Sequence, residues 1–402
     1  MIETDTAKSF IENPFPYFKK MHAYQAVQWV QLFNVEGWLV TGYKEAEAVL
    51  KDTRFIKEIR NIVPQEDMPP ISPSLMPIVN LNRNMMLFRD APHHTRLRSL
   101  VTKAFTPRMT EKLRPAITDM CHYLLDQMKG KLEHELISDL AYTLPVMVIA
   151  ELIGVPKDDR NQFKVWSEAF VKFIDINTTE EDLVEIAPPL EEADHYMRKL
   201  IKQKRNAPAE DLLSGLIDVS DSGDKLNEDE LVATCLLLLI AGHETTVNLI
   251  TNGYYLLLKH PEEMAKIKEN PTLIRNAVEE MLRFDPPVLL TSRWVGEDME
   301  FYGQHLKKAQ PIFVALGAAN RDPEIMENPD VFSVTRSPIK HLSFASGAHF
   351  CLGAPLARLE AEIVIEMLVR RVEHVELLKK PERRNSVVIR GFEALHFRGE
   401  IN

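Results

Sequence analysis

The sequence has no excess of positive charge. Its 402 residues include 48 Lys and Arg against 59 Asp and Glu, which gives a formal net charge of −11. A protein that binds nucleic acid chiefly through its electrostatic field needs a positive balance, so we expect no nucleic-acid partner. Hydrophobic residues, at 45%, and charged residues, at 27%, are close to the averages of folded proteins. The chain is therefore predicted to fold around a large core.

The sequence also lacks an apolar N-terminal segment and a long apolar run. Its first five residues, MIETD, are acidic and do not resemble a secretory signal. The longest uncharged apolar stretch, residues 231–242, is shorter than the roughly 20 residues that cross a bilayer. We expect a cytoplasmic monomer with no membrane helix.

Cysteine and glycine are scarce, and their patterns exclude several common chemistries. The three cysteines, Cys121, Cys235 and Cys351, are an odd number without a C-x-x-C pair, which disfavours a disulfide framework, a structural zinc site and c-type haem attachment. The 15 glycines form no G-x-G, G-x-x-x-x-G-K or G-x-S-x-G pattern. The sequence therefore has neither of the usual glycine-rich phosphate-binding loops nor the nucleophile elbow of an α/β-hydrolase. The His-Glu pair at 243–244 begins like a zinc-protease helix, but residue 247 is valine instead of the second histidine.

With few glycines and long stretches of apolar residues at helical spacing, the chain is predicted to be mostly helical. Strand-like runs are short and lie near the two ends, at residues 27–32, 37–41, 299–302, 311–314 and 393–397. We expect one domain over residues 1–402 that is mainly α with a smaller β-rich lobe.

One predicted helix is long enough to cross the whole molecule. It follows Asn227, whose side chain can cap it with Glu230 at the third helical position, and it ends before Pro261. A polar group, residues 242–246, interrupts its apolar middle. Buried polar groups at this position need partners or a function.

The sequence around Cys351 sets this cysteine apart from the other two. It reads FASGAHFCLGAPLAR, in which Gly347 and Gly353 allow tight turns on both sides of the sulfur, and helical spacing follows. Cys351 is thus expected just before a helix N-terminus, where backbone N–H groups favour a thiolate, the form that ligates iron. Cys121 and Cys235 lie in apolar helical patterns and are predicted to be buried small hydrophobes.

The motif F-x-x-G-x-x-x-C-x-G, formed by Phe344, Gly347, Cys351 and Gly353, resembles the haem-binding loop of the cytochrome P450 family. The resemblance spans residues 13–397 and implies a cytochrome P450-like fold, haem b (iron protoporphyrin IX) as cofactor, and Cys351 as the axial ligand of the iron. It also places Phe344 and Gly353 beside the haem. A Cys thiolate in this position favours cleavage of the O–O bond, so the resemblance implies a monooxygenase that uses O2.

The polar segment of the long helix, AGHETT, is similar to the oxygen-activation segment of that family. Gly242 has no side chain where dioxygen must approach closely, and the Thr245 hydroxyl can bond a carbonyl of the preceding turn or a guest molecule. The resemblance implies that Glu244 and Thr245 are the catalytic residues, steering protons through water to dioxygen. Glu244 stands where some relatives have Asp, which preserves the role and alters its reach.

Two further groups match the family in order and spacing. Glu280 and Arg283 lie three residues apart on a predicted helix, so they can pair. Together with Arg336 they resemble the family's buried structural network, which holds the loop that presents the cysteine.

The second group would bind the haem. His94 and Arg98 lie four residues apart on one helical face, so both can donate hydrogen bonds to the same carboxylate. The resemblance implies that these two residues, with Arg293 and His349, bind the haem propionates.

By family position, the substrate should face residues 85–88, 170–173, 236–240, 288–290 and 391–395. These segments are mostly apolar, so the expected substrate is an apolar small molecule of fatty-acyl, steroid, terpenoid or macrolide-like character. Arg83 and His243 are candidate polar contacts. The residues expected to line the pocket are Met85, Met86, Leu87, Ile240, Val288, Leu289, Leu290 and Phe392.

The chain contains no flavin or iron–sulfur motif, so electrons from NAD(P)H are expected through a separate ferredoxin or flavodoxin. An acidic donor would need a local basic patch on this acidic protein, for which Arg96, Lys103, Lys340 and Arg358 are candidates.

Two alternatives remain open. A haem-thiolate peroxygenase would more commonly carry Arg and Pro where this chain has Glu244 and Thr245. A non-enzymatic haem-based sensor would share the Cys ligand but would not need that pair.

Overall fold

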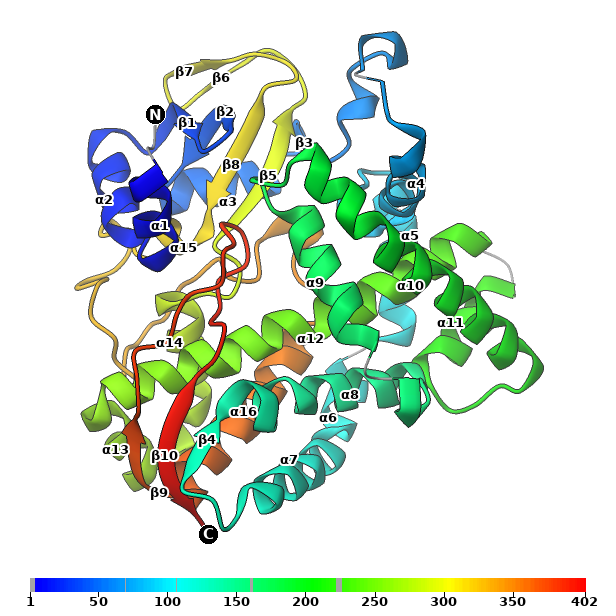
Figure 1. The fold of residues 1–402 in the computed structure, drawn as a ribbon. Coiled ribbons are helices and arrows are strands. Elements are labelled where there is room, and N and C mark those ends of the chain that lie inside the picture. Colours follow the sequence, from blue (N-terminus) through cyan, green and yellow to red (C-terminus); the bar gives the residue numbers. More distant parts are fainter. Residues whose placement is uncertain (1–3, 69, 106, 160–161, 222–225) are drawn as a thin grey trace.

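The computed structural model describes residues 4–68, 70–105, 107–159, 162–221 and 226–402. A helical body carries a smaller β-rich lobe, seen at the upper left of Figure 1, where the N-terminal segment meets the strands of residues 290–315. The mainly α architecture with a β-rich lobe is thereby confirmed.

The helices and strands occupy the following ranges. The α-helices are α1 (Thr4–Glu12), α2 (Phe15–Tyr24), α3 (Tyr43–Lys51), α4 (Met76–Asn84), α5 (His93–Ala104), α6 (Pro107–Lys112), α7 (Arg114–Met128), α8 (Thr143–Ile153), α9 (Gln162–Ile174), α10 (Glu180–Asn206), α11 (Leu212–Asp221), α12 (Glu228–Lys259), α13 (Pro261–Glu269), α14 (Ile274–Phe284), α15 (Leu316–Ala319) and α16 (Ala354–Arg371). The strands are β1 (Val27–Leu32), β2 (Val35–Val40), β3 (Phe55–Ile56), β4 (Glu133–Glu135), β5 (Leu290–Val295), β6 (Met299–Phe301), β7 (Gln304–Leu306), β8 (Pro311–Ala315), β9 (Val372–Leu377) and β10 (His396–Ile401).

The main sheet has the strand order β1-β2-β8-β5-β3. Only the pairing of β2 with β8 is parallel among its four ladders; the others are antiparallel. Alternate residues face opposite sides, so Ile312 packs in one hydrophobic cluster and Phe313 in another. This sheet positions β5, on which Arg293 pairs with Ile312.

The predicted strands agree with the structure except near the C-terminus. The strand at 27–32 matches β1, and those at 37–41, 299–302 and 311–314 differ from β2, β6 and β8 by one or two residues at an end. The prediction for 393–397 is wrong for its first three residues, because β10 begins at His396. There, Glu393 bonds to the carbonyl of Glu382 and Leu395 to the side chain of Glu135.

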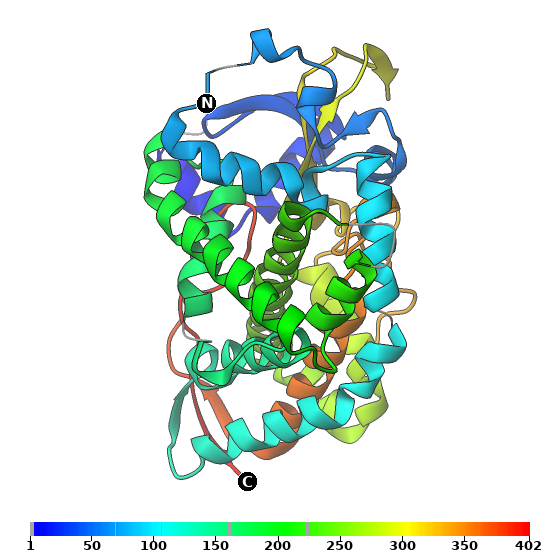
Figure 2. The same ribbon diagram turned by 90° about the vertical axis from the view of Figure 1, so that its right-hand side faces the viewer.

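The long helix α12 begins and ends as predicted. The Asn227 side chain accepts from the Glu230 N–H at 2.8 Å, and Glu230 accepts from the Asn227 N–H at 3.0 Å, which completes a capping box. The helix runs through the helical body and contacts α8, α10 and α16 (Figure 2). It is the one helix among the described residues long and apolar enough to cross a membrane, but 78% of its most apolar 18-residue window is buried, as in a core helix.

Candidate active site

One cavity of about 360 Å³ brings most of the predicted site residues together. Its walls come from α5, α9, α12, β5 and the loop before α16. Cys351, Phe344 and Gly353 lie on one wall, and Gly242, Glu244 and Thr245 on another, although more than 90 residues separate the two segments in the chain. The fold therefore joins the cysteine loop and the polar segment of α12 in one site.

The cysteine loop is built on close backbone contacts. The Cys351 N–H donates to the Phe344 carbonyl at 2.9 Å, closing the loop on itself. Gly347 has φ +69°, and a Cβ atom there would lie 2.4 Å from the Leu50 carbonyl oxygen. Only glycine meets both conditions without strain. The loop then enters α16, three residues after Cys351.

The protonation of Cys351 differs from the sequence-based expectation. Burial raises the pKa of the thiol, and the backbone N–H groups of Gly353 and Ala354 and the charge of Arg98 offset this only in part. The helix N-terminus thus stabilises the thiolate, as expected, but burial has the larger effect and favours the neutral thiol. A coordinated metal ion deprotonates a thiol outright, so the thiolate form would arise on metal binding.

Basic residues form a cluster on the cavity wall beside the cysteine loop. All four residues predicted to bind propionates, His94, Arg98, Arg293 and His349, line the cavity, and the rings of the two histidines are 4.1 Å apart. Burial, followed by the charge of Arg293, lowers the pKa of His349 to about 2. Burial likewise lowers the pKa of Arg293 to about 10. Burial is thus the main cause of both shifts, and for Arg293 the charge of Asp90 opposes it only in part.

Sequence reasoning missed a fifth member, Lys57. It follows the two-residue strand β3, and its Nζ lies 3.5 Å from Thr291 Oγ1 on β5. The same hydroxyl accepts a hydrogen bond from Arg293 Nη1 at 3.3 Å. No local pattern marks Lys57, because the fold alone carries it to this wall.

This set of residues fits a haem. Among the described residues, no carboxylate oxygen lies within 4 Å of the side-chain nitrogens of Lys57, Arg98 or Arg293. Buried cations need anionic partners, and the two propionates of a haem would supply them. A cysteine sulfur accessible from the same cavity would supply the iron ligand.

The polar residues of α12 have defined partners. Thr245 Oγ1 donates to the Ala241 carbonyl and Thr246 Oγ1 to the Gly242 carbonyl, both at 3.0 Å. Glu244 is 4% exposed, forms an ion pair with Arg384, and accepts from Asn248 Nδ2 at 3.4 Å. Arg384 lies 140 residues further along the chain, and no sequence motif marked it.

Gly242 lines the cavity, but a Cβ atom there would point towards α8. It would lie 3.3 Å from Ile149 Cδ1, a tight contact that accounts for the small residue. His243 is fully buried, outside the cavity lining, with Nδ1 2.9 Å from the Leu239 carbonyl. It is therefore not a polar contact for a molecule in the cavity, and Arg83 also lies outside the lining.

Glu280, Arg283 and Arg336 form the predicted network. The first two are fully buried and joined by bonds of 2.7 and 2.8 Å, and Arg336 Nε donates to Glu280 at 3.1 Å. Arg283 also donates to the Asn320 carbonyl at 3.2 Å, and the Asn320 side chain bonds the Leu342 N–H at 2.7 Å. Leu342 lies two residues before Phe344, so the network leads directly into the cysteine loop.

The predicted substrate-facing residues divide into two sets. Met86, Leu87, Ile240, Val288 and Leu290 line the cavity.

The other three predicted residues do not line the cavity, and these predictions are wrong for separate reasons. Met85 is fully buried in the main core, and Leu289 packs with Phe10 and Phe18 in another hydrophobic cluster. Phe392 packs against Tyr255, with ring centroids 4.9 Å apart.

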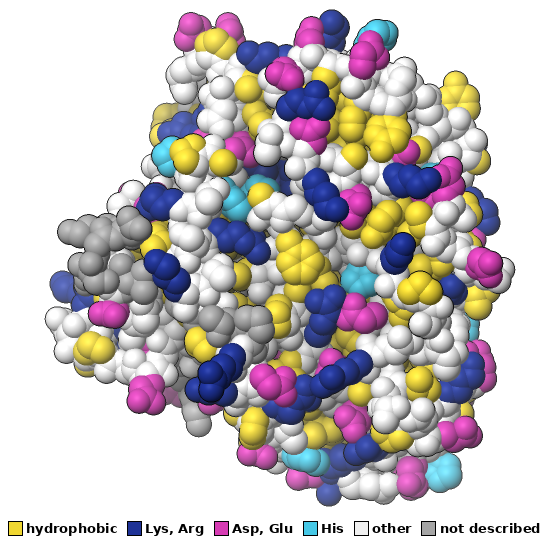
Figure 3. Space-filling model, turned by 180° about the vertical axis from the view of Figure 1, so that it is seen from behind, with side chains coloured by type: hydrophobic (Ala, Val, Ile, Leu, Met, Phe, Trp, Pro, Cys, Tyr) yellow, Lys and Arg dark blue, Asp and Glu magenta, His cyan; other side chains and the backbone are white. Residues whose placement is uncertain are grey.

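Of the four residues predicted to dock the electron donor, two have ion-pair partners among the described residues and two do not. Arg96 pairs with Glu230, and Arg358 pairs with Glu279 at 2.5 Å while its guanidinium lies 4.5 Å from the centre of the Phe344 ring. Lys103 and Lys340 are exposed, and no carboxylate of the described residues lies within 4 Å of either. Figure 3 shows a face of the molecule on which Lys and Arg side chains alternate with Asp and Glu, without one large basic area.

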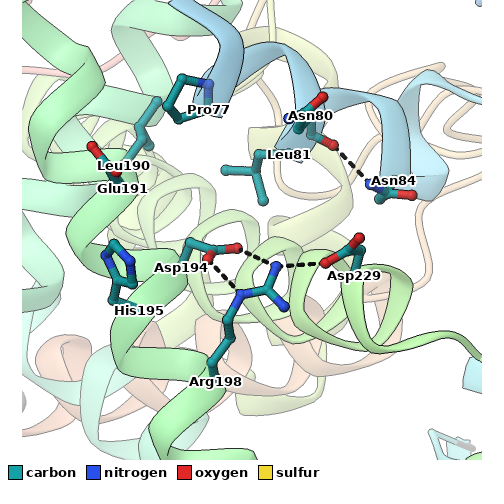
Figure 4. Close-up of a pocket in the computed structure, with 10 residues that line it drawn as sticks. All are labelled: Pro77, Asn80, Leu81, Asn84, Leu190, Glu191, Asp194, His195, Arg198 and Asp229. Carbon is teal, nitrogen blue, oxygen red and sulfur yellow. Dashed lines mark hydrogen bonds and ion pairs between the residues drawn. The ribbon is translucent and has the colours of Figure 1, made fainter.

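A second pocket lies between α4, α10 and the start of α12 and is lined mainly by polar side chains (Figure 4). Arg198 bridges Asp194, at 2.7 Å, and Asp229, at 2.6 Å. Arg205 pairs with Glu228 in the same turn of α12 at 2.8 Å. The ion pairs of Arg198 and Arg205 thus join α10 to α12, and this pocket contains none of the predicted site residues.

The fold and the lining of the cavity together define a haem-dependent oxidoreductase. The family model described as Cytochrome P450 matches residues 9–389, and the chain belongs to the cytochrome P450 family.

Similar proteins cover almost the whole chain. The biotin biosynthesis cytochrome P450 of Bacillus subtilis is 43% identical over 377 residues, 94% of this chain and 93% of that one. A crystal structure of P450BioI, in complex with an acyl carrier protein ligated to hexadec-9Z-enoic acid, has a TM-score of 0.92, 42% identity and coverage of 98% and 100%. A myxobacterial cytochrome P450 in complex with myristic acid has a TM-score of 0.90, 37% identity and coverage of 98% of each chain.

Proposed function

We propose that this monooxygenase uses haem b to insert one oxygen atom from O2 into a fatty-acyl-like molecule, with electrons from NAD(P)H delivered by a separate ferredoxin or flavodoxin. One observation carries the proposal: the Cys351 thiol and the Glu244–Thr245 pair face the same cavity, whose remaining lining is mostly apolar. The first is suited to bind the iron and the second to supply protons.

The protein's part is to bind, orient and exclude water. Bound haem supplies the capacity to activate dioxygen. Cys351 would bind its iron, and His94, Arg98, Arg293 and His349 would hold its propionates. The network of Glu280, Arg283 and Arg336 keeps the cysteine loop in place, so that the position of the sulfur does not depend on the ligand.

Proton transfer would run along α12. Glu244 connects the cavity with Arg384, whose side chain is 24% exposed, so its carboxylate stands between solvent and the reaction site. The Thr245 hydroxyl, which donates to the Ala241 carbonyl, keeps its oxygen lone pairs free to accept a proton donor in the cavity. Together the two residues can hold and pass on a proton.

Two features support a fatty-acyl substrate. The cavity lining includes Leu87, Phe88, Phe170, Ile240 and Leu290, which suit a hydrocarbon chain. Two similar structures are described as complexes with acyl chains of this kind. The donor protein would dock near the exposed Lys103 and Lys340, and the reaction would take place in the cytoplasm.

The test combines a spectrum with a turnover measurement. The reduced protein with carbon monoxide should show the red-shifted Soret band of a thiolate ligand, and Cys351→Ala should abolish it, whereas Cys121→Ala and Cys235→Ala should not. Oxidation of NAD(P)H should then depend on both a fatty acid and a ferredoxin or flavodoxin. Product formation with hydrogen peroxide alone, at the rate seen with the reduced partner, would identify a peroxygenase instead. Absence of any fatty-acid-dependent oxidation would contradict the substrate assignment.

A further inference from the structure

We propose that Asp175 is a positioning residue for the substrate: its carboxylate holds two walls of the cavity together, and so sets how firmly an apolar chain is held and which of its carbons is oxidised. This inference rests on the proposed function and adds a residue that does not itself contact the substrate. Its basis is the set of hydrogen bonds that one carboxylate makes between two distant segments of the chain.

The two segments that Asp175 joins both supply apolar residues to the cavity. The first is the end of α9 with the residues after it, and the second precedes β10. They meet where the C-terminal chain, red in Figure 1, passes the end of α9, although 212 residues separate Asp175 from Val387 in the sequence. The cavity-lining residues nearest to the junction are Ile174, Ile176, Val388 and Ile389.

The Asp175 carboxylate accepts four hydrogen bonds from described residues. Its Oδ2 atom accepts from Ser386 Oγ at 2.5 Å, from the Val387 N–H at 2.9 Å and from the Val388 N–H at 3.3 Å. Its Oδ1 atom accepts from the Asn177 N–H at 3.0 Å, within the turn that follows α9. Hydrogen bonds to an ionised acceptor are stronger than those between neutral groups. One side chain therefore fastens the second segment to the first.

Asp175 is suited to position the walls and not to bind the substrate. It does not line the cavity, although both of its neighbours in the sequence do. No Lys, Arg or His nitrogen of the described residues lies within 4 Å of its carboxylate, and Lys172, in the last turn of α9, pairs instead with Asp182 at 2.8 Å. The charge of Asp175 is thus directed at the donors of the second segment.

The fastened segment is also attached to the chain that enters β5. The Val388 carbonyl accepts from the Leu289 N–H at 2.8 Å, and Ile389 forms a β-bridge with Val288, which lines the cavity as well. Loss of the Asp175 carboxylate would free the segment from α9 and leave it attached to β5. We therefore expect the cavity wall to shift while the fold is retained.

The experiment measures release and product distribution in Asp175→Ala, on the haem-loaded full chain. Dodecanoic acid is the substrate, and 4-phenylimidazole is a second probe, because its imidazole nitrogen binds iron whatever the natural substrate is. A hydrogen bond to a charged group corresponds to roughly a 10- to 100-fold change in an equilibrium, so both probes should dissociate about ten-fold faster in stopped-flow absorbance. The KM for dodecanoic acid should rise, with kcat changing little. The oxidised positions should spread over neighbouring carbons, because the chain is less firmly oriented.

A measurement without turnover accompanies these. The amide groups of Val387 and Val388 donate to Asp175, so their hydrogen exchange should become about ten-fold faster in Asp175→Ala, by loss of one charge-assisted hydrogen bond. Asp175→Asn keeps an acceptor oxygen without the charge, and each of its effects should be intermediate. This variant also tests the inference if Asp175→Ala does not fold.

Asp298→Ala is the matched control. Its carboxylate likewise accepts from a backbone N–H of another turn, that of Lys308 at 2.9 Å, but Asp298 does not line the cavity and neither does Lys308. This substitution should change neither the release of the two probes nor the product distribution.

Three results would overturn the inference. The first is unchanged release of 4-phenylimidazole in Asp175→Ala, and the second is an unchanged distribution of products from dodecanoic acid. The third is an equal effect of Asp298→Ala, which would reflect a general loss of stability. If the unaltered protein does not oxidise dodecanoic acid, the proposed substrate is wrong, whereas the release of 4-phenylimidazole and the hydrogen exchange still decide the role of Asp175.

Discussion

Arg384 forms an ion pair with Glu244, the acidic residue of the polar segment of α12. The segment that carries Arg384 is pressed against the same helix: a Cβ atom on Gly391 would lie 1.9 Å from Asn248 Oδ1, and Asn248 in turn approaches Glu244 at 3.4 Å. The Arg384 N–H donates to the Gly391 carbonyl at 3.2 Å. The orientation of Glu244 is therefore set from outside the helix, by the chain that precedes β10.

Replacing this partner should impair proton supply without removing the haem. In Arg384→Gln the carboxylate of Glu244 loses its charge partner but is itself retained. We therefore expect product per NAD(P)H to fall by about ten-fold, less than the roughly 100- to 10,000-fold contribution of a general acid or base. Hydrogen peroxide should rise in proportion. The solvent deuterium isotope effect on turnover should also change, which a purely structural role would not cause.

Two variants control this prediction. Arg384→Lys keeps the positive charge and should restore most of the coupling. Arg398→Gln removes an exposed arginine that pairs with Glu133, and it should leave coupling unchanged. Normal coupling in Arg384→Gln would mean that Glu244 does not depend on this contact.

Thr245→Ala should uncouple electron transfer from oxygen insertion. The haem spectrum should be retained, because Thr245 has no part in the cysteine loop, while electrons are diverted to hydrogen peroxide. Thr251→Ala is the matched control, since this buried hydroxyl donates to the Val247 carbonyl at 2.9 Å on the same helix but does not line the cavity. Product yield per electron, measured for both, should fall only in Thr245→Ala; an unchanged yield there would refute the assigned role.

Breaking the buried network should destabilise the protein. Arg283→Ala leaves the Glu280 carboxylate buried without its main partner, which costs roughly 3–5 kcal/mol of unfolding free energy. Haem content should fall at the same time, because the cysteine loop loses its support. Arg370→Ala, at an exposed pair with Glu366, should cost no more than about 1 kcal/mol. Equal effects of the two substitutions on chemical denaturation would contradict a structural role for the network.

Glu279 should make stability depend on acidic pH. Burial alone would raise the pKa of this carboxyl, but hydrogen bonds from His341 and Arg358 outweigh it and lower the pKa to about 2. A lowered folded-state pKa stabilises the protein above the unfolded-state value of about 4.5, and this contribution is lost as the pH falls towards 2. Glu279→Gln should therefore be less stable than the unaltered protein at pH 6, and the difference in thermal midpoint should shrink below pH 4.5. A difference that is constant with pH would show that the charge of Glu279 does not matter.

The parts of the fold that local chemistry determines could be predicted from the sequence. The bounds of α12 follow from the Asn227 capping box and from Pro261, and β1 follows from its β-branched and aromatic residues. β5 was not predicted, because Thr291 and Arg293 interrupt the alternation expected of a strand: they face a polar wall of the cavity. The burial of Arg293 reflects the site, whereas Leu290 and Val295 at the two ends of the strand pack in apolar clusters.

The same division applies to the site. Cys351 and the α12 segment are recognisable because their function constrains adjacent residues. Lys57 and Arg384 could not be recognised from the sequence, because each contacts a partner that lies far away in the chain. Only the tertiary structure brings each side chain to its partner. Met85 and Leu289 were misassigned because each is buried in a hydrophobic cluster next to a residue that lines the cavity, and the sequence pattern does not distinguish the two neighbours.

The segment between α15 and the cysteine loop, residues 320–346, contains no helix and no strand. Five of its carbonyl groups nevertheless have side-chain donors, because Arg283 and Arg336 between them bond the carbonyls of Asn320, Glu327, Asn328, Pro329 and Val331. Two guanidinium groups thus do here what a neighbouring strand does in a sheet. The order of this segment therefore depends on one arginine of its own, Arg336, and on Arg283, which is 37 residues before Asn320. A single substitution on α14 can disorder a stretch of backbone whose own sequence is unaltered.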